Sequence, residues 1–505
     1  MSEPARSRTR AFTLTLLTGQ GLTMLTLAVA FLATPVLVRS LGAERYGMWR
    51  VLEAWVLFVG VIPLCVTHAG GFLLVPLLSE RDPERLRRFA ATLAVVGGAV
   101  AAAVSVAGLV LVPALPWIAS GPEELAGERL TAFLIALLAA APLAPLLLLR
   151  CVLEADQKGY LINAVIAAQS LTVTGVAVWL AVGGAGLPGQ AVAVSAGAAV
   201  QALLFALLAY RRYSWARPGR PSRADAVVLL RRASGLFALA FLGGIAARAD
   251  YLLGNLTGAW DGPTETASYN LGQRLFLVYA GLVAAIGNSI WAPAADLYHR
   301  GQAERLREQL GRAVRGTAAV AAAGVVAIAA VTPEFLRLWV GEGYDPGDAA
   351  RWGFAVHFPL LGVNILLSSV LTATGHTRAM FASSATYCVA TLGGVAWLGS
   401  LSGPGGVAWG MALGVGAAVV TNVGLAGAAF GVPPARVALS LLTTAALGIP
   451  YALGLAELLS LAPGMGWAGV IAALAAGWAG FLALGWFLIL TREDRDALRS
   501  RLRGQ

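Results

Sequence analysis

Charge is scarce in this sequence, and so are lysine, cysteine and long polar segments. Only 12% of the 505 residues are charged and 58% are apolar, whereas a typical soluble domain is about 25% charged and about 45–50% apolar. Mean hydropathy is +0.75, and apolar stretches of roughly 18 residues or more recur along the chain. No soluble fold could bury so much apolar surface. The composition therefore excludes a soluble enzyme, a disordered chain and a receptor with one membrane anchor, and predicts an all-α, polytopic membrane protein.

The residues that usually carry enzyme chemistry are few and dispersed. Cys65, Cys151 and Cys388 lie in or at the ends of apolar segments without CxxC spacing, so neither a disulfide framework nor a zinc site is predicted. The four histidines have no ligand spacing, and P-loop, GxSxG, HExxH and EF-hand patterns are lacking. The longest connection between apolar segments runs only from Arg211 to Arg232, which leaves no room for a soluble catalytic domain. We therefore predict that the protein is not an enzyme and needs no cofactor.

Apolar runs bounded by charges, prolines and glycines predict about fourteen membrane helices of roughly 20 residues or more. Their ranges are 14–37, 47–77, 89–113, 130–151, 160–183, 189–210, 235–258, 269–294, 316–339, 352–373, 379–401, 405–430, 435–459 and 467–490. Most basic residues fall in alternate connections, which lie on the cytoplasmic side if the N-terminus does. The acids gather in the opposite connections. Fourteen helices with both termini in the cytoplasm therefore fit best, and the dispersed arginine clusters do not predict nucleic acid as a partner.

Two parts of the chain repeat a common pattern. Tyr46 at the mouth of the second helix corresponds to Tyr269 at the mouth of the eighth, and Glu84 corresponds to Glu304 at a nearly constant offset. Six helices per repeat predict two parallel, pseudo-symmetric lobes that face a central cavity. The predicted domains are an N-terminal lobe, a basic cytoplasmic connector, a C-terminal lobe, and two further helices with a cytoplasmic tail, over 1–213, 214–232, 233–430 and 431–505 respectively.

Five charged residues fall within or at the ends of predicted membrane helices: Arg50, Glu53, Arg248, Asp250 and Arg274. A charge at the bilayer centre costs about 2.5–3.5 kcal/mol on insertion scales, so such residues face protein or water. Arg248 and Asp250 are two residues apart and point in different directions from a helix, so each is expected to have partners on other helices. Arg50 and Glu53 have the i,i+3 spacing of an ion pair.

Two interpretations of these charges are open. Arg50, Glu53 and Arg274 can extend to the outer interface, and Arg248 and Asp250 can form inter-helix ion pairs that only fix packing. In the functional interpretation, the arginines line a water-filled cavity that binds an anionic substrate, and Asp250 or Glu53 couples transport to H⁺ or Na⁺.

Several segments resemble one family of transporters. The first spans 37–49 and reads Leu-Val-Arg-Ser-Leu-Gly-Ala-Glu-Arg-Tyr-Gly-Met-Trp, and the others span 293–307, 336–344 and 371–375. In their order and predicted topology they resemble the polysaccharide transporters, which are O-antigen-type flippases for lipid-linked oligosaccharides. These belong to the multidrug/oligosaccharidyl-lipid/polysaccharide (MOP) exporter superfamily. Where many relatives have Asp-x-Gly late in the second helix, this sequence has His68-Ala69-Gly70, which leaves Asp250 and Glu53 as candidate coupling acids.

The resemblance implies two six-helix lobes in the bacterial cytoplasmic membrane. An undecaprenyl-diphosphate-linked oligosaccharide would move from the inner to the outer leaflet by alternating access, for polysaccharide export. Arg248, Arg274 and Arg50 would bind the substrate. The expected partners are the lipid-linked glycan, membrane lipids, and glycan polymerases or glycosyltransferases. Alternatives are a cation-coupled drug or metabolite antiporter of the same superfamily, a lipid II flippase, and a membrane glycan ligase or polymerase.

Overall fold

The computed structural model describes residues 5–59, 61–80, 82–216, 219–461, 464–492 and 495, and these residues form helices, turns and loops without a strand. The extreme ends of the predicted N-terminal lobe and C-terminal tail, residues 1–4 and 496–505, lie outside the described residues. The all-α prediction is confirmed.

The helices are long and apolar enough to make this a multi-pass membrane protein. Twelve of the described helices could span a bilayer by length and composition, or thirteen if one bent pair is counted as a span. Each of the fourteen predicted ranges lies on a helix or on two consecutive helices. Two predicted ranges, 379–401 and 405–430, lie on one helix that is broken at Ser402 and Gly403, which explains part of the lower count. Many large apolar side chains, such as Trp179 and Val420, are more than 70% exposed, as lipid-facing residues are.

By their internal contacts, the described helices form two compact units, one over residues 1–244 with 262–264 and the other over 245–261 with 265–505. The first unit contains α1 (Ala5–Val59), α2 (Val61–Glu80), α3 (Pro83–Val110), α4 (Leu115–Ile118), α5 (Ala126–Leu147), α6 (Arg150–Ala155), α7 (Gly159–Val182), α8 (Gly186–Arg212) and nearly all of α9 (Arg223–Ala246). Short 3-10 turns, Val112–Ala114, Glu123–Leu125 and Ser214–Ala216, join some of them.

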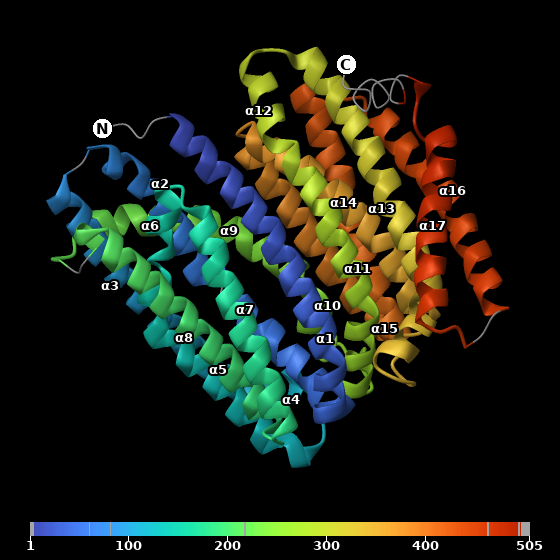
Figure 1. Ribbon diagram of the computed structural model, residues 1–505, viewed down its shortest axis with the longest axis horizontal. Coiled ribbons are helices and arrows are strands. Elements are labelled where there is room, and N and C mark those ends of the chain that lie inside the picture. Colours follow the sequence, from blue (N-terminus) through green and yellow to red (C-terminus); the bar gives the residue numbers. More distant parts are fainter. Residues whose placement is uncertain are drawn as a thin grey trace. The chain divides into compact units, whose positions relative to one another are not determined.

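Helices α1, α5, α7 and α8 lie side by side in the first unit (Figure 1). The α1 backbone is broken at Gly42, whose φ of 75° and ψ of 164° are not helical. The predicted first span therefore lies before this break, and the second span begins after it and continues into α2. One buried apolar cluster is built around Phe89, Leu153 and Phe205, and another around Trp49 and Phe133.

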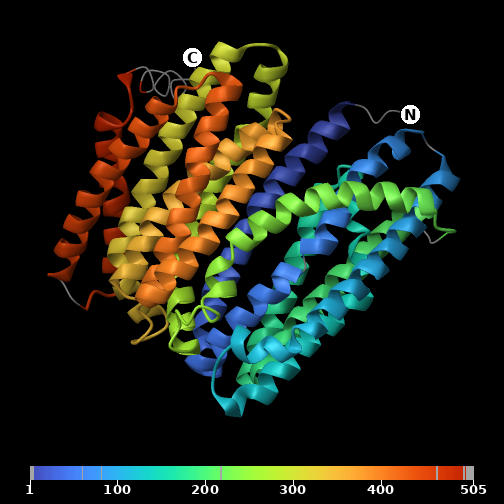
Figure 2. The ribbon, with the colours of Figure 1, turned by 180° about the vertical axis from the view of Figure 1, so that it is seen from behind.

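The second unit contains α10 (Ala249–Leu253), α11 (Pro263–Ser289), α12 (Trp291–His299), α13 (Ala303–Trp339), α14 (Asp348–Ala373), α15 (Thr377–Phe430), α16 (Pro434–Ser460) and α17 (Trp467–Leu488). Helix α13 packs against α14, α16 and α17, and α14 packs against α15 (Figure 2). One buried apolar cluster of the second unit includes Leu310, Leu366 and Phe430.

Helix α9 differs from the prediction in its extent. The sequence predicts a connector without an apolar pattern over 214–232, whereas α9 begins at Arg223. Leu229 and Ala233 of α9 are buried in the apolar cluster of the first unit, so the first unit extends further along the chain than 1–213. The limits of the two lobes, 1–213 and 233–430, stay a prediction.

Candidate functional site

The predicted seventh membrane helix is interrupted where its two charges lie. Helix α9 ends at Ala246, Ala247 and Arg248 form a turn, and α10 begins at Ala249. Arg248 is the N-cap residue of α10, with φ −128° and ψ 12°. Non-helical backbone at membrane depth is tolerated only where it is buried in protein or lines a water-filled cavity. The interruption therefore marks the segment around Arg248 as a candidate binding site, because discontinuous membrane helices form the binding sites of many known transporters.

Asp250 is fully enclosed, with 1% of its surface exposed. Its Oδ1 accepts a hydrogen bond from the Tyr251 N–H at 2.9 Å, and its Oδ2 accepts one from Gln273 Nε2 at 3.1 Å. Gln273 lies on α11, so the expected partner on another helix is confirmed for Asp250. No ion pair within 4.0 Å joins Asp250 to any described residue, although Arg248 acts on it electrostatically. The predicted direct ion pair that would only fix packing is therefore not formed at Asp250.

A directional chain of hydrogen bonds leads to Asp250. Asn270 Nδ2 donates to the Tyr251 hydroxyl at 2.7 Å, and this hydroxyl donates to Gln273 Oε1 at 3.2 Å. Gln273 then donates to Asp250. Asn270, Tyr251 and Gln273 are all less than 9% exposed, so the chain is shielded from solvent and holds the carboxylate in one orientation.

A cluster of aromatic rings contacts this polar chain at Tyr251. The Tyr269 ring contacts those of Trp260 and Phe354 edge-on, at centroid distances of 4.9 and 4.8 Å, and Tyr251 at 6.1 Å. The Tyr269 hydroxyl is buried, and Asp250 acts on it electrostatically. Tyr269, Trp260 and Phe354 are all buried, so they form a packed aromatic core beside the polar chain.

Arg274 lies one helical turn after Asn270 on α11 and is half-buried. Arg248, Asp250 and Arg274 all belong to the second unit. The hydrogen-bond chain therefore joins Asp250 of α10 to the part of α11 that carries Arg274.

Arg50 and Glu53 lie on α1 in the first unit and form the predicted i,i+3 ion pair, so this expectation is confirmed. Their side chains are 25% and 24% exposed. Arg50 already compensates the negative charge of Glu53, so a bound cation would stabilise Glu53 less than it would stabilise Asp250.

A second charged group in the first unit was missed by the sequence analysis. Glu154 on α6 accepts a hydrogen bond from Arg150 Nε at 2.7 Å, and its other oxygen lies 3.6 Å from His68 Nδ1 on α2. The His68 side chain is 45% exposed and faces this carboxylate. The available signal was the histidine in place of the Asp of Asp-x-Gly, together with an acid at the end of the fourth predicted span.

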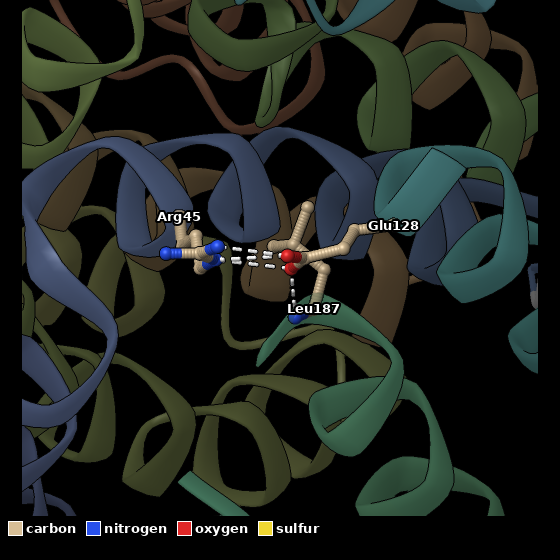
Figure 3. A network of polar contacts seen from close by, with 3 residues as sticks. All are labelled: Arg45, Glu128 and Leu187. Carbon is tan, nitrogen blue, oxygen red and sulfur yellow. Dashed lines mark hydrogen bonds and ion pairs between the residues drawn. The ribbon is translucent and has the colours of Figure 1, made fainter. Parts of the chain in front are cut away.

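The ion pair between Arg45 and Glu128 joins three helices of the first unit (Figure 3). Arg45 Nε and Nη2 donate to the Glu128 carboxylate at 3.0 and 2.8 Å, and the Leu187 N–H donates to the same group at 3.2 Å. The three residues come from α1, α5 and the start of α8. Because every oxygen of Glu128 is engaged within this unit, we interpret the group as structural.

An open apolar cavity of about 550 Å³ lies within the second unit. Helices α13, α14, α15 and α16 line it, with Val326, Trp352, Trp409, Leu441 and Ile449 among the lining side chains. Leu442 and Ile449 are 67% and 54% exposed, so the cavity opens along the side of α16 that is available to lipid.

Solved structures with the same fold are transporters. The lipid II flippase MurJ in an inward closed conformation matches with a TM-score of 0.71 at 13% identity, over 94% of this chain and 99% of that chain. An inward-facing multidrug resistance MATE family transporter of the MOP superfamily matches with a TM-score of 0.68 at 17% identity, over 79% and 93% of the two chains. The MATE multidrug transporter DinF-BH in complex with R6G has a TM-score of 0.62 at 16% identity, over 85% and 96%.

Comparisons with protein-family models and with curated protein sequences give no match. The fold nevertheless defines the class: this is a multi-pass membrane protein with the fold of MOP-superfamily transporters. The resemblance to that superfamily is thus confirmed for the fold. Its assignment to the oligosaccharide branch stays a prediction.

Proposed function

We propose that this protein is a flippase that moves an undecaprenyl-diphosphate-linked oligosaccharide, or a related anionic glycolipid, from the inner to the outer leaflet of the bacterial cytoplasmic membrane. In this proposal the two lobes alternate access to the two sides, both termini lie in the cytoplasm, and no covalent bond is made or broken. Glycan polymerases or glycosyltransferases would supply or consume the substrate.

The extent of the structural match is the observation that carries this proposal. The match to the lipid II flippase covers 94% of this chain, whereas the match to the first MATE transporter covers 79%. Helices α16 and α17 with their connections span 434–488, which is more of the chain than the flippase match leaves out. Part of this region is therefore shared with the flippase, and a flippase is favoured over a drug antiporter.

Arg248 and Arg274 are proposed to bind the diphosphate. Both are half-buried, on the two segments that the Asp250 hydrogen-bond chain connects. A guanidinium group offers several N–H donors in a planar arrangement that suits phosphate oxygens. Arg50 is a weaker candidate because Glu53 already neutralises it.

Asp250 is proposed to be the coupling acid. A carboxylate that is buried without an ion pair is strongly destabilised unless a proton or a metal cation neutralises it. The amide oxygens and the hydroxyl of the neighbouring chain are hard ligands that suit Na⁺ as well as they suit a hydrogen-bonded proton. Binding of substrate and of the coupling cation would then alternate at neighbouring positions.

Export of the glycan in cells tests the role of the two arginines. We expect Arg248→Ala and Arg274→Ala to lower the amount of glycan outside the cell by roughly ten- to a hundredfold, as expected for loss of a charge-assisted hydrogen bond. Arg220→Ala, at an exposed loop position, is the matched control. Undiminished export by both site variants at normal protein levels would rule out the assignment.

Lipid II is the second candidate substrate, since a lipid II flippase has the same fold. Complementation separates the two. A lipid II flippase would restore growth when the cell's own lipid II flippase is depleted, whereas a flippase for another glycan would restore only the export of that glycan.

A further inference from the structure

Helix α14 carries a polar stripe in the part of the helix that follows Pro359. Between 361 and 372 the accessible positions are 361, 364, 365, 368, 369 and 372, and the positions between them are buried. Four of these six accessible residues are polar, and they form the α14 polar stripe: Asn364, Ser368, Ser369 and Thr372. The buried positions hold only glycine, valine and leucine, so the polar side chains gather on the accessible face of the helix.

The stripe lies on a helix that is long and apolar enough to span a bilayer. The accessible face of α16 is of the opposite kind, since Leu442, Ile449 and Leu453 are all more than half exposed there. Hydrocarbon offers no hydrogen-bond partner, so polar side chains of a membrane helix face protein, water or a polar ligand. The face of α16 is therefore suited to lipid, and the α14 polar stripe is not.

Asn422 of α15 holds two residues of the stripe from behind. Its Nδ2 donates to Asn364 Oδ1 at 2.8 Å and to Ser368 Oγ at 3.1 Å. Asn422 is 0% exposed, and its own Oδ1 is buried without a hydrogen-bond partner among the described residues. Turning the amide over would exchange its oxygen and nitrogen and would leave the nitrogen unpaired instead. A buried unpaired polar atom destabilises a fold, so packing alone does not explain an asparagine at this position.

The contacts of Asn422 use acceptors of the stripe and leave donors available. Within the described part of the chain, Asn364 Nδ2 and the Ser368 hydroxyl hydrogen make no hydrogen bond. Thr372 donates to the Ser368 carbonyl at 2.8 Å, so its hydroxyl oxygen can still accept. From 364 to 372 the stripe extends over about 12 Å of helix. It can therefore bind a ligand that both donates and accepts along its length.

The stripe suits a neutral, hydroxyl-rich ligand better than a phosphate. Helix α14 has no charged residue after Arg351, and phosphate groups are bound most strongly by cationic side chains. Sugar hydroxyl and acetamido groups, by contrast, each offer a donor and an acceptor. Neutral amide and hydroxyl side chains match both.

We propose that the α14 polar stripe binds the sugar part of the transported lipid-linked glycan, and that Asn422 is the positioning residue behind it. Asn364 and Ser368 donate to oxygens of the sugar, and Thr372 accepts from a sugar hydroxyl. The proposal rests on the proposed flippase function. It adds a separate sugar site to the diphosphate site proposed above.

Binding of two ligands to the purified full chain in detergent tests the proposal. The probes are the lipid-linked glycan extracted from the bacterium that produces the protein, and undecaprenyl diphosphate without sugar. We expect Asn364→Ala/Ser368→Ala to raise the Kd for the glycan about tenfold, since each neutral hydrogen bond contributes a factor of roughly 2 to 12. The Kd for undecaprenyl diphosphate should not change. The matched control, Ser440→Ala/Thr443→Ala, removes two half-buried hydroxyls that donate to carbonyls of their own helix and should alter neither Kd.

Asn422→Leu separates positioning from packing. It removes the unpaired oxygen within nearly the same volume, so the thermal midpoint should be unchanged or higher. The Kd for the lipid-linked glycan should nevertheless rise about three- to tenfold. A lower midpoint with an unchanged Kd would show that Asn422 serves packing only. If the double variant of the stripe does not fold, Ser368→Ala alone should still weaken glycan binding about threefold.

The two probes distinguish failure of the sugar site from failure of the proposed function. Equal affinity of the unaltered protein for both probes, or an equal loss in the control variant, would overturn the sugar site and leave the flippase proposal standing. Binding of neither probe would overturn both. Dimers in the native mass spectrum that Asn364→Ala/Ser368→Ala dissociates would assign the stripe to a contact between two copies of the chain.

Discussion

Asp250 receives hydrogen bonds from the Tyr251 N–H and from the Gln273 amide, at 2.9 and 3.1 Å. Two neutral donors compensate only part of the solvation that a buried carboxylate loses. Glu53, by comparison, has Arg50 as an ion-pair partner and is about one quarter exposed. At the scale of single residues, this contrast favours Asp250 over Glu53 as the proposed coupling acid.

We therefore expect Asp250→Asn to abolish the coupling of transport to a cation gradient without lowering the stability of the protein. We expect its thermal midpoint to be unchanged or higher, because an amide is buried at less cost than an unpaired carboxylate. Transport by this variant in proteoliposomes should no longer respond to a pH or Na⁺ gradient.

Glu53→Gln is the matched control for this prediction. It should destabilise the protein by about 1 kcal/mol through loss of the Arg50 contact, and its transport should still respond to the gradient. If Asp250→Asn responded to the gradient like the unaltered protein, Asp250 would not be the coupling acid.

Three side-chain contacts also show which contacts a single sequence can predict. The Arg50–Glu53 pair was predictable because i,i+3 spacing on a helix fixes proximity. The contact between His68 and Glu154 was not, since it depends on how α2 and α6 pack. The partner of Asp250 on another helix was expected, but its identity as Gln273 could not be read from spacing.

At the scale of the elements, helix α15 shows how glycines permit two helix segments to pack closely. The sequence pattern Gly406-x-x-x-Gly410-x-x-x-Gly414 predicts close backbone packing within the bundle rather than dimerisation. A Cβ added at Gly410 would lie 2.5 Å from backbone atoms of Gly394 and Val395. These atoms belong to the other half of α15, across the break at Ser402 and Gly403, so packing within the chain is confirmed.

Gly410→Ala should consequently destabilise the protein by about 1–3 kcal/mol, since backbone atoms cannot move aside as a flexible side chain can. Thermal unfolding in detergent measures the effect. Gly393→Ala is the matched control, because this exposed position on the same helix has nothing within 4 Å of the added Cβ. It should be neutral or stabilising by up to about 1 kcal/mol. Equal destabilisation by both substitutions would contradict the packing argument.

Helix positions were more predictable than helix breaks. The thickness of the bilayer sets the length of apolar run that a membrane helix needs, so long apolar runs indicate helices directly. All fourteen predicted ranges therefore lie on helices. The interruption at Ala247 and Arg248 was not predicted, because the local sequence Ala-Ala-Arg-Ala-Asp has good helix formers and no glycine or proline. The start of α9 at Arg223 was missed because charged residues open a helix without apolar periodicity.

At the scale of the whole molecule, the arginine distribution predicts which connections lie in the cytoplasm. Arg220 and Glu124 are exposed residues of two connections that are predicted to lie on opposite sides. The native cysteines, Cys65, Cys151 and Cys388, are buried, so a single introduced cysteine can be labelled selectively.

Labelling of intact cells with a membrane-impermeant maleimide tests this topology. We expect Glu124→Cys to be labelled in intact cells and Arg220→Cys to be labelled only after the membrane is permeabilised. Labelling of both in intact cells, or the reverse order, would contradict fourteen spans with a cytoplasmic N-terminus. Masking by a bound partner is controlled by labelling both variants after solubilisation.

Transfer of a fluorescent undecaprenyl-diphosphate-linked oligosaccharide across proteoliposome membranes measures the proposed activity most directly. Label that has reached the inner leaflet is protected from a membrane-impermeant quencher. We predict transfer well above that of protein-free vesicles, slowed at least about tenfold by Arg248→Ala and Arg274→Ala. Transfer no faster than in protein-free vesicles, or equally fast transfer by both arginine variants, would contradict the account.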